Sequence, residues 1–170
     1  DRILNQEGDV TVEAERRPVT VVFTDLAGFT KLSEATPPAR VTALLNEYLN
    51  EMVALIDAHG GTLDKFMGDG IMVLFGAADP MEPDEQARRA VDMAVQMQAD
   101  DLDLRIGIHQ AEVTVGNFGS DELVEFTAIG RGVNLAARLE GACVPGGVLV
   151  SREVHDRTAS VVAFGPPQTF

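Results

Sequence analysis

The sequence predicts an α+β fold: a ferredoxin-like, palm-type sandwich with a β-α-β-β-α-β core and an extra αβ unit. Short β-branched and apolar runs alternate with two stretches of helical periodicity in that order. The turn Met67-Gly68-Asp69-Gly70 is a hairpin signature that joins the second and third predicted strands directly. The chain has 170 residues, which is most simply one domain.

The first predicted strand is the β-branched run Val19 to Phe23. A helix is expected to begin at Thr36-Pro37-Pro38, because Thr caps helices and Pro suits their first turn, and to end at Gly60-Gly61. Its apolar residues recur at three- and four-residue steps as one wide stripe: Val41, Leu44, Leu45, Tyr48, Leu49, Met52, Val53 and Ile56.

The hairpin strands are predicted at Thr62–Phe66 and Ile71–Phe75, and a second helix at about 84–99. The small apolar residues of this helix, including Ala87, Ala90 and Ala94, indicate close packing on a sheet. Further strands are expected at Leu104–Ile108, Glu112–Val115, Val124–Ile129, Val148–Ser151 and Val161–Phe164, with helices at Gly132–Glu140 and Glu153–Thr158.

Residues 1–17 are polar and are interpreted as a linker from an upstream regulatory or sensor domain, and 18–170 as one domain. The chain starts at Asp1 and stops abruptly at Phe170, so we expect it to be part of a longer protein. No apolar run approaches the roughly 20 residues that span a bilayer, which predicts no membrane contact by this domain. The single Cys143 is interpreted as a packed thiol in a reducing compartment. We therefore expect the domain to lie in the cytoplasm, either in a free protein or as the cytoplasmic part of a membrane-tethered one.

The net charge of −14 argues against nonspecific binding to nucleic acid or anionic lipid. It also means that a polyanionic substrate needs local cations and metal ions. The sequence has no Gly-Lys-Ser/Thr phosphate loop, no Rossmann glycine fingerprint and no paired cysteines, which excludes the commonest nucleotide and zinc motifs.

Two acids stand at positions that suit metal ions. Asp25 ends an apolar strand before a glycine-containing turn, and Asp69 lies at the predicted hairpin tip. Two Mg²⁺ or Mn²⁺ ions sharing two carboxylates can activate an attacking oxygen and stabilise a leaving one. Each acid alone is more simply a helix cap or a turn former. The pair, placed at the strand end and the hairpin tip, favours the metal site.

Four cationic or amide side chains are the other candidates. Lys65, in an apolar strand, is either functional or an edge lysine, and Arg105 either reaches phosphate or is an ordinary surface residue. Asn134 and Arg138 fall at i and i+4 on one helix face. Asn can hold a sugar oxygen and Arg can neutralise charge on a phosphate; the alternative is a solvated polar face. The three histidines have no ligand spacing and are taken as structural or surface residues.

Over about 18–165 the sequence resembles the catalytic domain of class III nucleotidyl cyclases, the adenylate/guanylate cyclase homology domain. The resemblance lies in the segments Phe23–Thr30, Asp64–Gly70 and Phe126–Glu140. In that family two domains pack head to tail, with active sites at their interface. The resemblance therefore implies a homodimer that binds ATP and two divalent cations, with sites shared between the protomers.

The resemblance also implies individual roles at the metal and phosphate end of the site. Asp25 and Asp69 match the metal-binding pair, with the Leu26 carbonyl as a further ligand. The backbone at Gly28, Phe29 and Thr30 would cradle the β- and γ-phosphates, and Arg105 matches a phosphate-contacting arginine.

At the other end, Lys65 and Thr127 of the opposite protomer match the pair that reads the purine. Lysine there points to adenine, because guanylate cyclases usually carry glutamate, and threonine resembles a bacterial subgroup often described as bicarbonate-responsive. Asn134 matches the ribose-orienting residue and Arg138 the transition-state arginine.

Three departures from the family pattern bear on activity or dimer geometry. Gln110-Ala111 replaces a usual Thr-Gly, and Arg131 stands where an acid is frequent. The chain also ends before a segment near which the family has a phosphate-binding lysine, so the domain is expected to be C-terminally truncated.

The leading hypothesis is an adenylate cyclase that forms 3′,5′-cyclic AMP and pyrophosphate from ATP by a two-metal mechanism. A noncatalytic nucleotide-binding or dimerisation module is the alternative from another class, and a guanylate cyclase is disfavoured by Lys65. The identity of the sensor, regulation by bicarbonate or calcium, and the dimer affinity are left open by the sequence.

Overall fold

The computed structural model describes residues 14–99 and 102–169. These residues form one six-stranded sheet with the order β2-β3-β1-β4-β5, and β6 pairs with β4. The strands are β1 (Glu15–Leu26), β2 (Thr62–Met67), β3 (Gly70–Phe75), β4 (Leu104–Gly119), β5 (Val124–Ile129) and β6 (Val148–Val150). The helices are α1 (Phe29–Ala35), α2 (Pro38–Ala58), α3 (Pro83–Met97), α4 (Arg131–Ala142) and α5 (Arg152–Thr158).

The topology confirms the predicted ferredoxin-like α+β sandwich. β1 lies in the middle of the sheet and pairs antiparallel with β3 on one side and β4 on the other. β2 pairs antiparallel with β3 through the predicted hairpin. Two interleaved β-α-β units of this kind define the ferredoxin-like core. β5, α4 and β6 extend it beyond β4.

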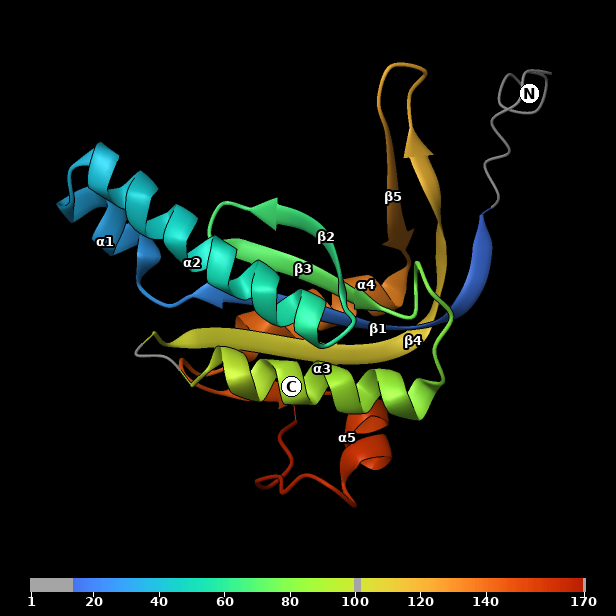
Figure 1. The fold of residues 1–170 in the computed structure, drawn as a ribbon. Coiled ribbons are helices and arrows are strands. Elements are labelled where there is room, and N and C mark those ends of the chain that lie inside the picture. Colours follow the sequence, from blue (N-terminus) through green and yellow to red (C-terminus); the bar gives the residue numbers. More distant parts are fainter. Residues whose placement is uncertain (1–13, 100–101, 170) are drawn as a thin grey trace.

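Helices cover both faces of the sheet (Figure 1). α2 and α3 lie on one face, where they bury the larger hydrophobic core, which includes Met52, Ile56, Phe75, Met93 and Ile106. α4 lies on the opposite face over a smaller core that includes Val19, Val21, Leu74, Val113 and Ala136. Alternate residues of β1 enter the two cores, as the two-residue period of a strand requires.

The absence of a side chain at Gly107 lets α4 approach β4 closely. A Cβ atom built there would lie 2.3 Å from the Glu140 backbone nitrogen and 2.6 Å from the Ala136 carbonyl oxygen. Real atoms do not approach so closely, so any other residue would push the helix away from the sheet. Gly107 therefore fixes the position of α4 and of the side chains that it carries.

The structure corrects several element predictions. Leu104–Ile108 and Glu112–Val115 belong to one strand, β4, because both segments pair continuously with β1. Residues 29–35 form the unpredicted helix α1, and the N-cap of α2 is Pro37, with no side-chain cap from Thr36. The predicted strand Val161–Phe164 is wrong, since no sheet hydrogen bonds engage it.

β1 begins at Glu15 and thus takes in the end of the segment interpreted as a linker over 1–17. Residues 1–13 lie outside the described residues. The α2 stripe is apolar along its whole length, but only Tyr48, Met52 and Ile56 are buried. Leu44 is 42% exposed, because the first half of α2 extends past the sheet together with α1 (Figure 1).

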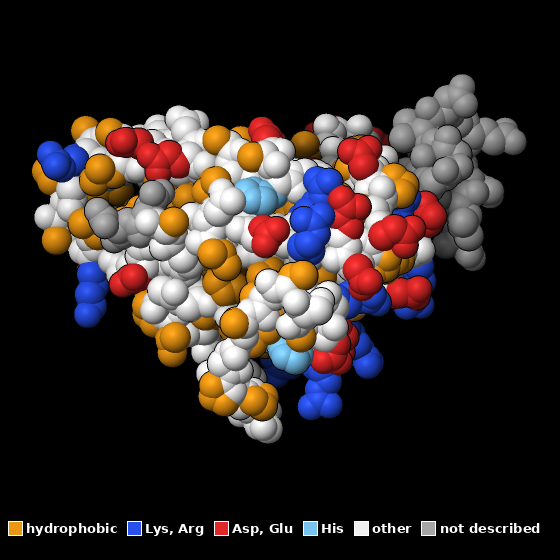
Figure 2. Space-filling model, turned by 60° about the horizontal axis from the view of Figure 1, so that its bottom comes forward, with side chains coloured by type: hydrophobic (Ala, Val, Ile, Leu, Met, Phe, Trp, Pro, Cys, Tyr) orange, Lys and Arg blue, Asp and Glu red, His pale blue; other side chains and the backbone are white. Residues whose placement is uncertain are grey.

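Acidic and basic side chains are intermixed on the face that carries α3 and α5 (Figure 2). Arg88 of α3 pairs with Glu85 and Asp92, and Arg157 of α5 pairs with Asp84. Cys143 is a buried free thiol, as predicted, and burial raises its pKa. None of the described helices combines the length and the apolar character needed to cross a membrane.

Candidate active site

The two acids singled out in the sequence meet at one end of the sheet. Asp69, in the turn between β2 and β3, accepts a hydrogen bond at Oδ2 from the backbone N–H of Leu26, with a nitrogen–oxygen distance of 2.8 Å. Leu26 directly follows Asp25 at the end of β1. The fold of a single chain therefore places Asp69 against the end of β1 that carries Asp25.

Strand register and two glycines create this arrangement. Asp25 lies opposite Arg105 in the β1–β4 register, and the Arg105 Nη1 atom is 3.7 Å from Asp25 Oδ1. Gly68 in the hairpin turn has a φ of 65°, a left-handed conformation that glycine adopts without strain. A Cβ on Gly70 would lie 3.2 Å from the Thr24 carbonyl oxygen, so the hairpin tip rests against β1.

Glu140, on α4, is a third acid at this place, and sequence reasoning missed it. Burial and a hydrogen bond with Asp25 raise the pKa of Glu140 to about 7, against an opposing effect of Arg105. Gly107 is the sequence signal that could have revealed it, because its missing side chain brings the Glu140 backbone against β4. We call Asp25, Asp69, Arg105 and Glu140 the carboxylate cluster.

The carboxylate cluster suits hard divalent cations. Asp25 Oδ1 is buried and has no hydrogen-bond partner within the described part of the chain. Carboxylate oxygens are the preferred protein ligands of Mg²⁺, which usually keeps one or two of them and takes its remaining ligands from water and substrate. Among residues 14–99 and 102–169, no three His, Cys, Asp or Glu side chains are placed so that they could hold a metal ion together. Asp25 and Asp69 are the residues that fit it.

The turn after Asp25 leads straight into α1. Gly28 is the N-cap of this helix, with a φ of 74°, and Leu32 donates its N–H to the Gly28 carbonyl oxygen. The first N–H groups of a helix have no acceptor within the helix. Those of Phe29 and Thr30 are thus available near the carboxylate cluster.

A second polar cluster joins the two edges of the sheet. The Thr127 hydroxyl of β5 donates to Asp64 Oδ2 of β2 over 2.9 Å, and Lys65 Nζ lies 3.6 Å from the same oxygen. The Asp64 side chain is 1% exposed, whereas that of Lys65 is 43% exposed. A β-bulge between Leu63 and Lys65 changes the local register. We call Asp64, Lys65 and Thr127 the hairpin–β5 cluster.

This cluster brings together two residues that the sequence predicted and one that it missed. Lys65 and Thr127 were both expected to serve one function, and Asp64 links them in the structure. β2 and β5 are separated in the sheet by three strands, so only strong curling of the sheet explains the contact. The bulge that turns Asp64 inward leaves no clear mark in the sequence.

Asn134 and Arg138 lie one turn apart on α4 and are both exposed. Neither side chain has a hydrogen bond or an ion pair with another described residue. The predicted shared face is thus present, and it is free to meet a ligand or another chain.

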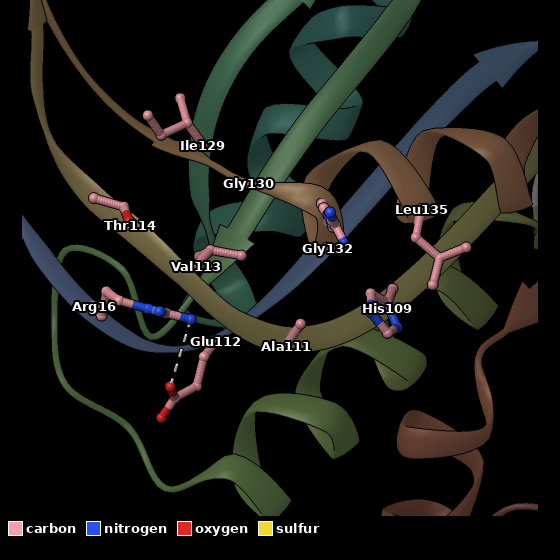
Figure 3. Close-up of a pocket in the computed structure, with 11 residues that line it drawn as sticks. Arg16, His109, Ala111, Glu112, Val113, Thr114, Ile129, Gly130, Gly132 and Leu135 are labelled. Atoms are coloured by element: carbon pink, nitrogen blue, oxygen red, sulfur yellow. Dashed lines mark ion pairs between the residues drawn. The ribbon is translucent and has the colours of Figure 1, made fainter.

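A shallow pocket of about 450 Å³ lies elsewhere, where the bend of β4 meets the end of β5 and the start of α4 (Figure 3). Ala111 and Gly132 lie on its floor, and Arg16 and Glu112 form an ion pair of 4.0 Å at its rim. His109 also lines it; burial lowers the pKa of this histidine, and Glu153 partly offsets the effect. None of the predicted site residues contributes to this pocket.

Comparison with known proteins identifies the family. Residues 11–164 match the model of the adenylate and guanylate cyclase catalytic domain. The chain belongs to this family. The matched range includes both clusters and all eleven site residues that were predicted from the sequence.

Relatives with this domain include adenylate cyclase 1 of Rhizobium meliloti, which is 34% identical over 167 residues. That alignment covers 90% of this chain and 25% of the relative. An uncharacterised protein of Mycobacterium tuberculosis is 36% identical, with 84% of this chain and 27% of that protein covered. The chain thus spans about a quarter of the length of the curated relatives that it matches.

Solved structures agree in fold. The adenylyl cyclase CyaB from P. aeruginosa superposes with a TM-score of 0.86 and 40% identity, over 89% of this chain and 85% of that one. The guanylyl cyclase Cya2 gives a TM-score of 0.79 and 39% identity, over 85% and 79%. Cyclases of both substrate specificities therefore share this fold at similar identity.

Proposed function

We propose that this chain is the catalytic domain of an adenylate cyclase, which converts ATP to 3′,5′-cyclic AMP and pyrophosphate. The contact of Asp69 with the end of β1 carries this proposal, because it brings a second carboxylate near Asp25, where a triphosphate and divalent cations could meet. Adenylate cyclase 1 and CyaB, among the similar proteins, support it. Lys65 favours ATP over GTP as the substrate.

The active form is proposed to be a head-to-tail homodimer with two shared sites. Large apolar side chains of the hairpin and of β5 are exposed in the single chain, and a second copy would cover such a surface. Their exposed fractions are 46% for Phe66, 45% for Met67, 50% for Val124 and 40% for Phe126. In this dimer, Lys65, Thr127, Asn134 and Arg138 of one copy would complete the site of the other.

The reaction is a single in-line displacement. The ribose 3′-oxygen forms a bond to the α-phosphorus, the bond from this phosphorus to the bridging oxygen of the β-phosphate breaks, and the 3′-hydroxyl proton passes to solvent. Asn134 is proposed to orient the ribose, and the Arg138 guanidinium to stabilise the negative charge that grows on the phosphoryl oxygens. Lys65 and Thr127 would hold the purine, so that the attacking oxygen starts in line.

Two divalent cations, Mg²⁺ or Mn²⁺, are proposed to be held by Asp25, Asp69 and the Leu26 carbonyl. Such ions lower the pKa of a coordinated hydroxyl and neutralise phosphate charge. Gly28, Phe29 and Thr30 would donate backbone N–H groups to the β- and γ-phosphates. Arg105, which pairs with Asp25, would contact phosphate as well.

The relatives are about four times as long as this chain, which supports a larger whole protein. We propose that it carries a sensor domain upstream of this one. Cytoplasmic ATP is the substrate that such a protein would use, so we place the domain in the cytoplasm. No nucleic acid or membrane partner is proposed for the domain itself.

A turnover assay with ATP and GTP side by side tests the proposal, using Mg²⁺ and Mn²⁺ at several protein concentrations. We expect cyclic AMP as the main product. The rate per chain should rise with protein concentration and level off once all chains are in dimers. Cyclic GTP as the main product would establish the second candidate, a guanylate cyclase, which the likeness to Cya2 favours. Nucleotide binding without any cyclic product would instead indicate a noncatalytic signalling module.

A further inference from the structure

Asp64 has no role in the function proposed above, yet its side chain is far more deeply buried than that of Asp25. Its side chain is 1% exposed, and one oxygen, Oδ2, faces both the Thr127 hydroxyl at 2.9 Å and Lys65 Nζ at 3.6 Å. Burying a carboxylate is costly unless its oxygens are paired. We therefore ask what Asp64 does for its two partners, and the contacts indicate that it fixes their orientation.

The hydrogen bond fixes the direction in which the Thr127 hydroxyl points. A hydroxyl has one proton and two acceptor lone pairs, whereas a carboxylate can only accept. Because the Thr127 proton is committed to Asp64, the oxygen can only accept a hydrogen bond from any ligand. Without the carboxylate, the hydroxyl could rotate and donate instead.

This polarity separates the two purines. The exocyclic group at position 6 is an N–H donor in adenine and a carbonyl acceptor in guanine. An acceptor-only Thr127 oxygen matches the adenine amine and repels the guanine carbonyl. We propose that Asp64 is a positioning residue for purine selectivity, which sets Thr127 as an acceptor and so favours adenine over guanine.

The same carboxylate oxygen also steadies Lys65. The lysine side chain is 43% exposed and long, and a neighbouring charge at 3.6 Å restricts where its ammonium group can go. The ammonium group can only donate, and position 1 of adenine accepts whereas position 1 of guanine carries a proton. Both partners of Asp64 thus select the same base. This inference rests on the proposed nucleotide site.

The test compares Asp64→Asn with wild type in two assays. The amide keeps the shape of the side chain but can donate to Thr127, which frees the hydroxyl proton for a guanine carbonyl. We expect the ratio of kcat/KM for ATP to that for GTP to fall about tenfold, the value of one hydrogen bond. The dissociation constants of 3′-deoxy-ATP and 3′-deoxy-GTP, which lack the attacking hydroxyl, should converge by a similar factor.

Thr127 variants provide the matched control. Thr127→Ser keeps the hydroxyl and should keep the selectivity, whereas Thr127→Val should lose it. In a Thr127→Val background, Asp64→Asn should lower the ratio by a smaller factor than in wild type, because only its effect through Lys65 remains. Should Asp64→Asn fail to fold, the contrast between Thr127→Ser and Thr127→Val still decides: equal selectivity in both would overturn the inference.

If Asp64→Asn lowers kcat/KM equally for ATP and GTP, Asp64 has a merely structural role and the inference is overturned. The proposed function would still stand, provided that the wild type produces cyclic AMP. Conversely, wild-type protein that forms no cyclic product but binds 3′-deoxy-ATP selectively, with convergence in Asp64→Asn, would uphold the inference and reject the cyclase proposal. The two claims therefore fail separately.

Discussion

Asp64 and Asp69 lie five residues apart on one hairpin and serve opposite parts of the molecule. Asp69 accepts a hydrogen bond from Leu26 at the end of β1, whereas Asp64 accepts one from Thr127 on β5. Asp64 is balanced by Lys65 and is nearly inaccessible. The carboxylate cluster instead gathers three acids around the single cation Arg105.

The difference indicates which cluster is complete without a ligand. In the hairpin–β5 cluster the polar groups already satisfy one another, so their geometry exists before substrate arrives. In the carboxylate cluster one buried oxygen of Asp25 has no hydrogen-bond partner, and the excess negative charge favours cations. The hairpin therefore contributes to one cluster whose polar groups are already paired and to another with excess negative charge, which we propose binds the divalent cations.

The largest effect is expected from removing an acid of the carboxylate cluster. Asp25→Ala should lower turnover by about 10³-fold or more, because neighbouring Asp69 cannot hold the cations alone. The measurement is cyclic AMP formation with Mg²⁺ and Mn²⁺. Asp57→Ala, on the exposed side of α2, is the matched control and should leave turnover unchanged. Cyclic AMP production like that of wild type in Asp25→Ala would reject the mechanism.

Removing the α4 arginine should act on the chemical step rather than on binding. Arg138→Ala is expected to lower kcat by about 10²-fold or more and to change KM much less, because the guanidinium stabilises charge that develops in the transition state. Steady-state kinetics with ATP separate the two. Arg152→Ala on α5 is the control. A raised KM with unchanged kcat would instead make Arg138 a ground-state binding residue.

Moving α4 away from the sheet should damage the carboxylate cluster without changing any of its residues. Gly107→Ala places a Cβ within 2.3 Å of the Glu140 nitrogen, and we expect about 1–3 kcal/mol of destabilisation, typical of overpacking. Gly141→Ala, on the same helix, meets nothing within 4 Å and should stabilise by up to about 1 kcal/mol. Urea unfolding measures both, and equal effects would contradict the close contact.

The smallest effect concerns the pH dependence of stability. Folding raises the pKa of Glu140 from 4.5 to about 7, so its carboxyl loses the proton at lower pH in the unfolded chain than in the folded one. The contribution of this group to stability is complete below pH 4.5 and is lost as pH rises towards 7. In metal-free buffer, the melting temperature of Glu140→Gln relative to wild type should therefore rise from pH 4.5 to 7 and stay level above.

Glu51→Gln, an exposed acid of α2, provides the baseline for that comparison. A difference between Glu140→Gln and wild type that does not vary with pH would mean that Glu140 lies outside the carboxylate cluster.

Most of the core and many of the site residues could be predicted because they depend on local patterns. The hairpin turn placed Asp69, and the run of β-branched residues placed Asp25 at a strand end. The i and i+4 spacing placed Asn134 and Arg138 on one exposed face. Each of these needs only strand or helix periodicity and turn chemistry.

The features that were missed depend on contacts between distant segments. Asp64 turns inward at a bulge and meets Thr127, 63 residues away, across the curled sheet. Glu140 joins the carboxylate cluster only because Gly107 admits α4. The continuous β4 likewise follows from its long pairing with β1, which runs without a break through residues 109–111, between the two predicted strands. Apart from Gly107, whose missing side chain permits the close approach of α4, no local pattern predicts these contacts.

The central claim is that the carboxylate cluster of one chain works with the α4 arginine of another. Mixing Asp25→Ala and Arg138→Ala, each nearly inactive alone, tests it directly. Random pairing gives about half mixed dimers, each with one intact site of two, so activity should return to about a quarter of wild type. Activity no greater than the average of the two separate variants would contradict the account and place both residues in a site within one chain.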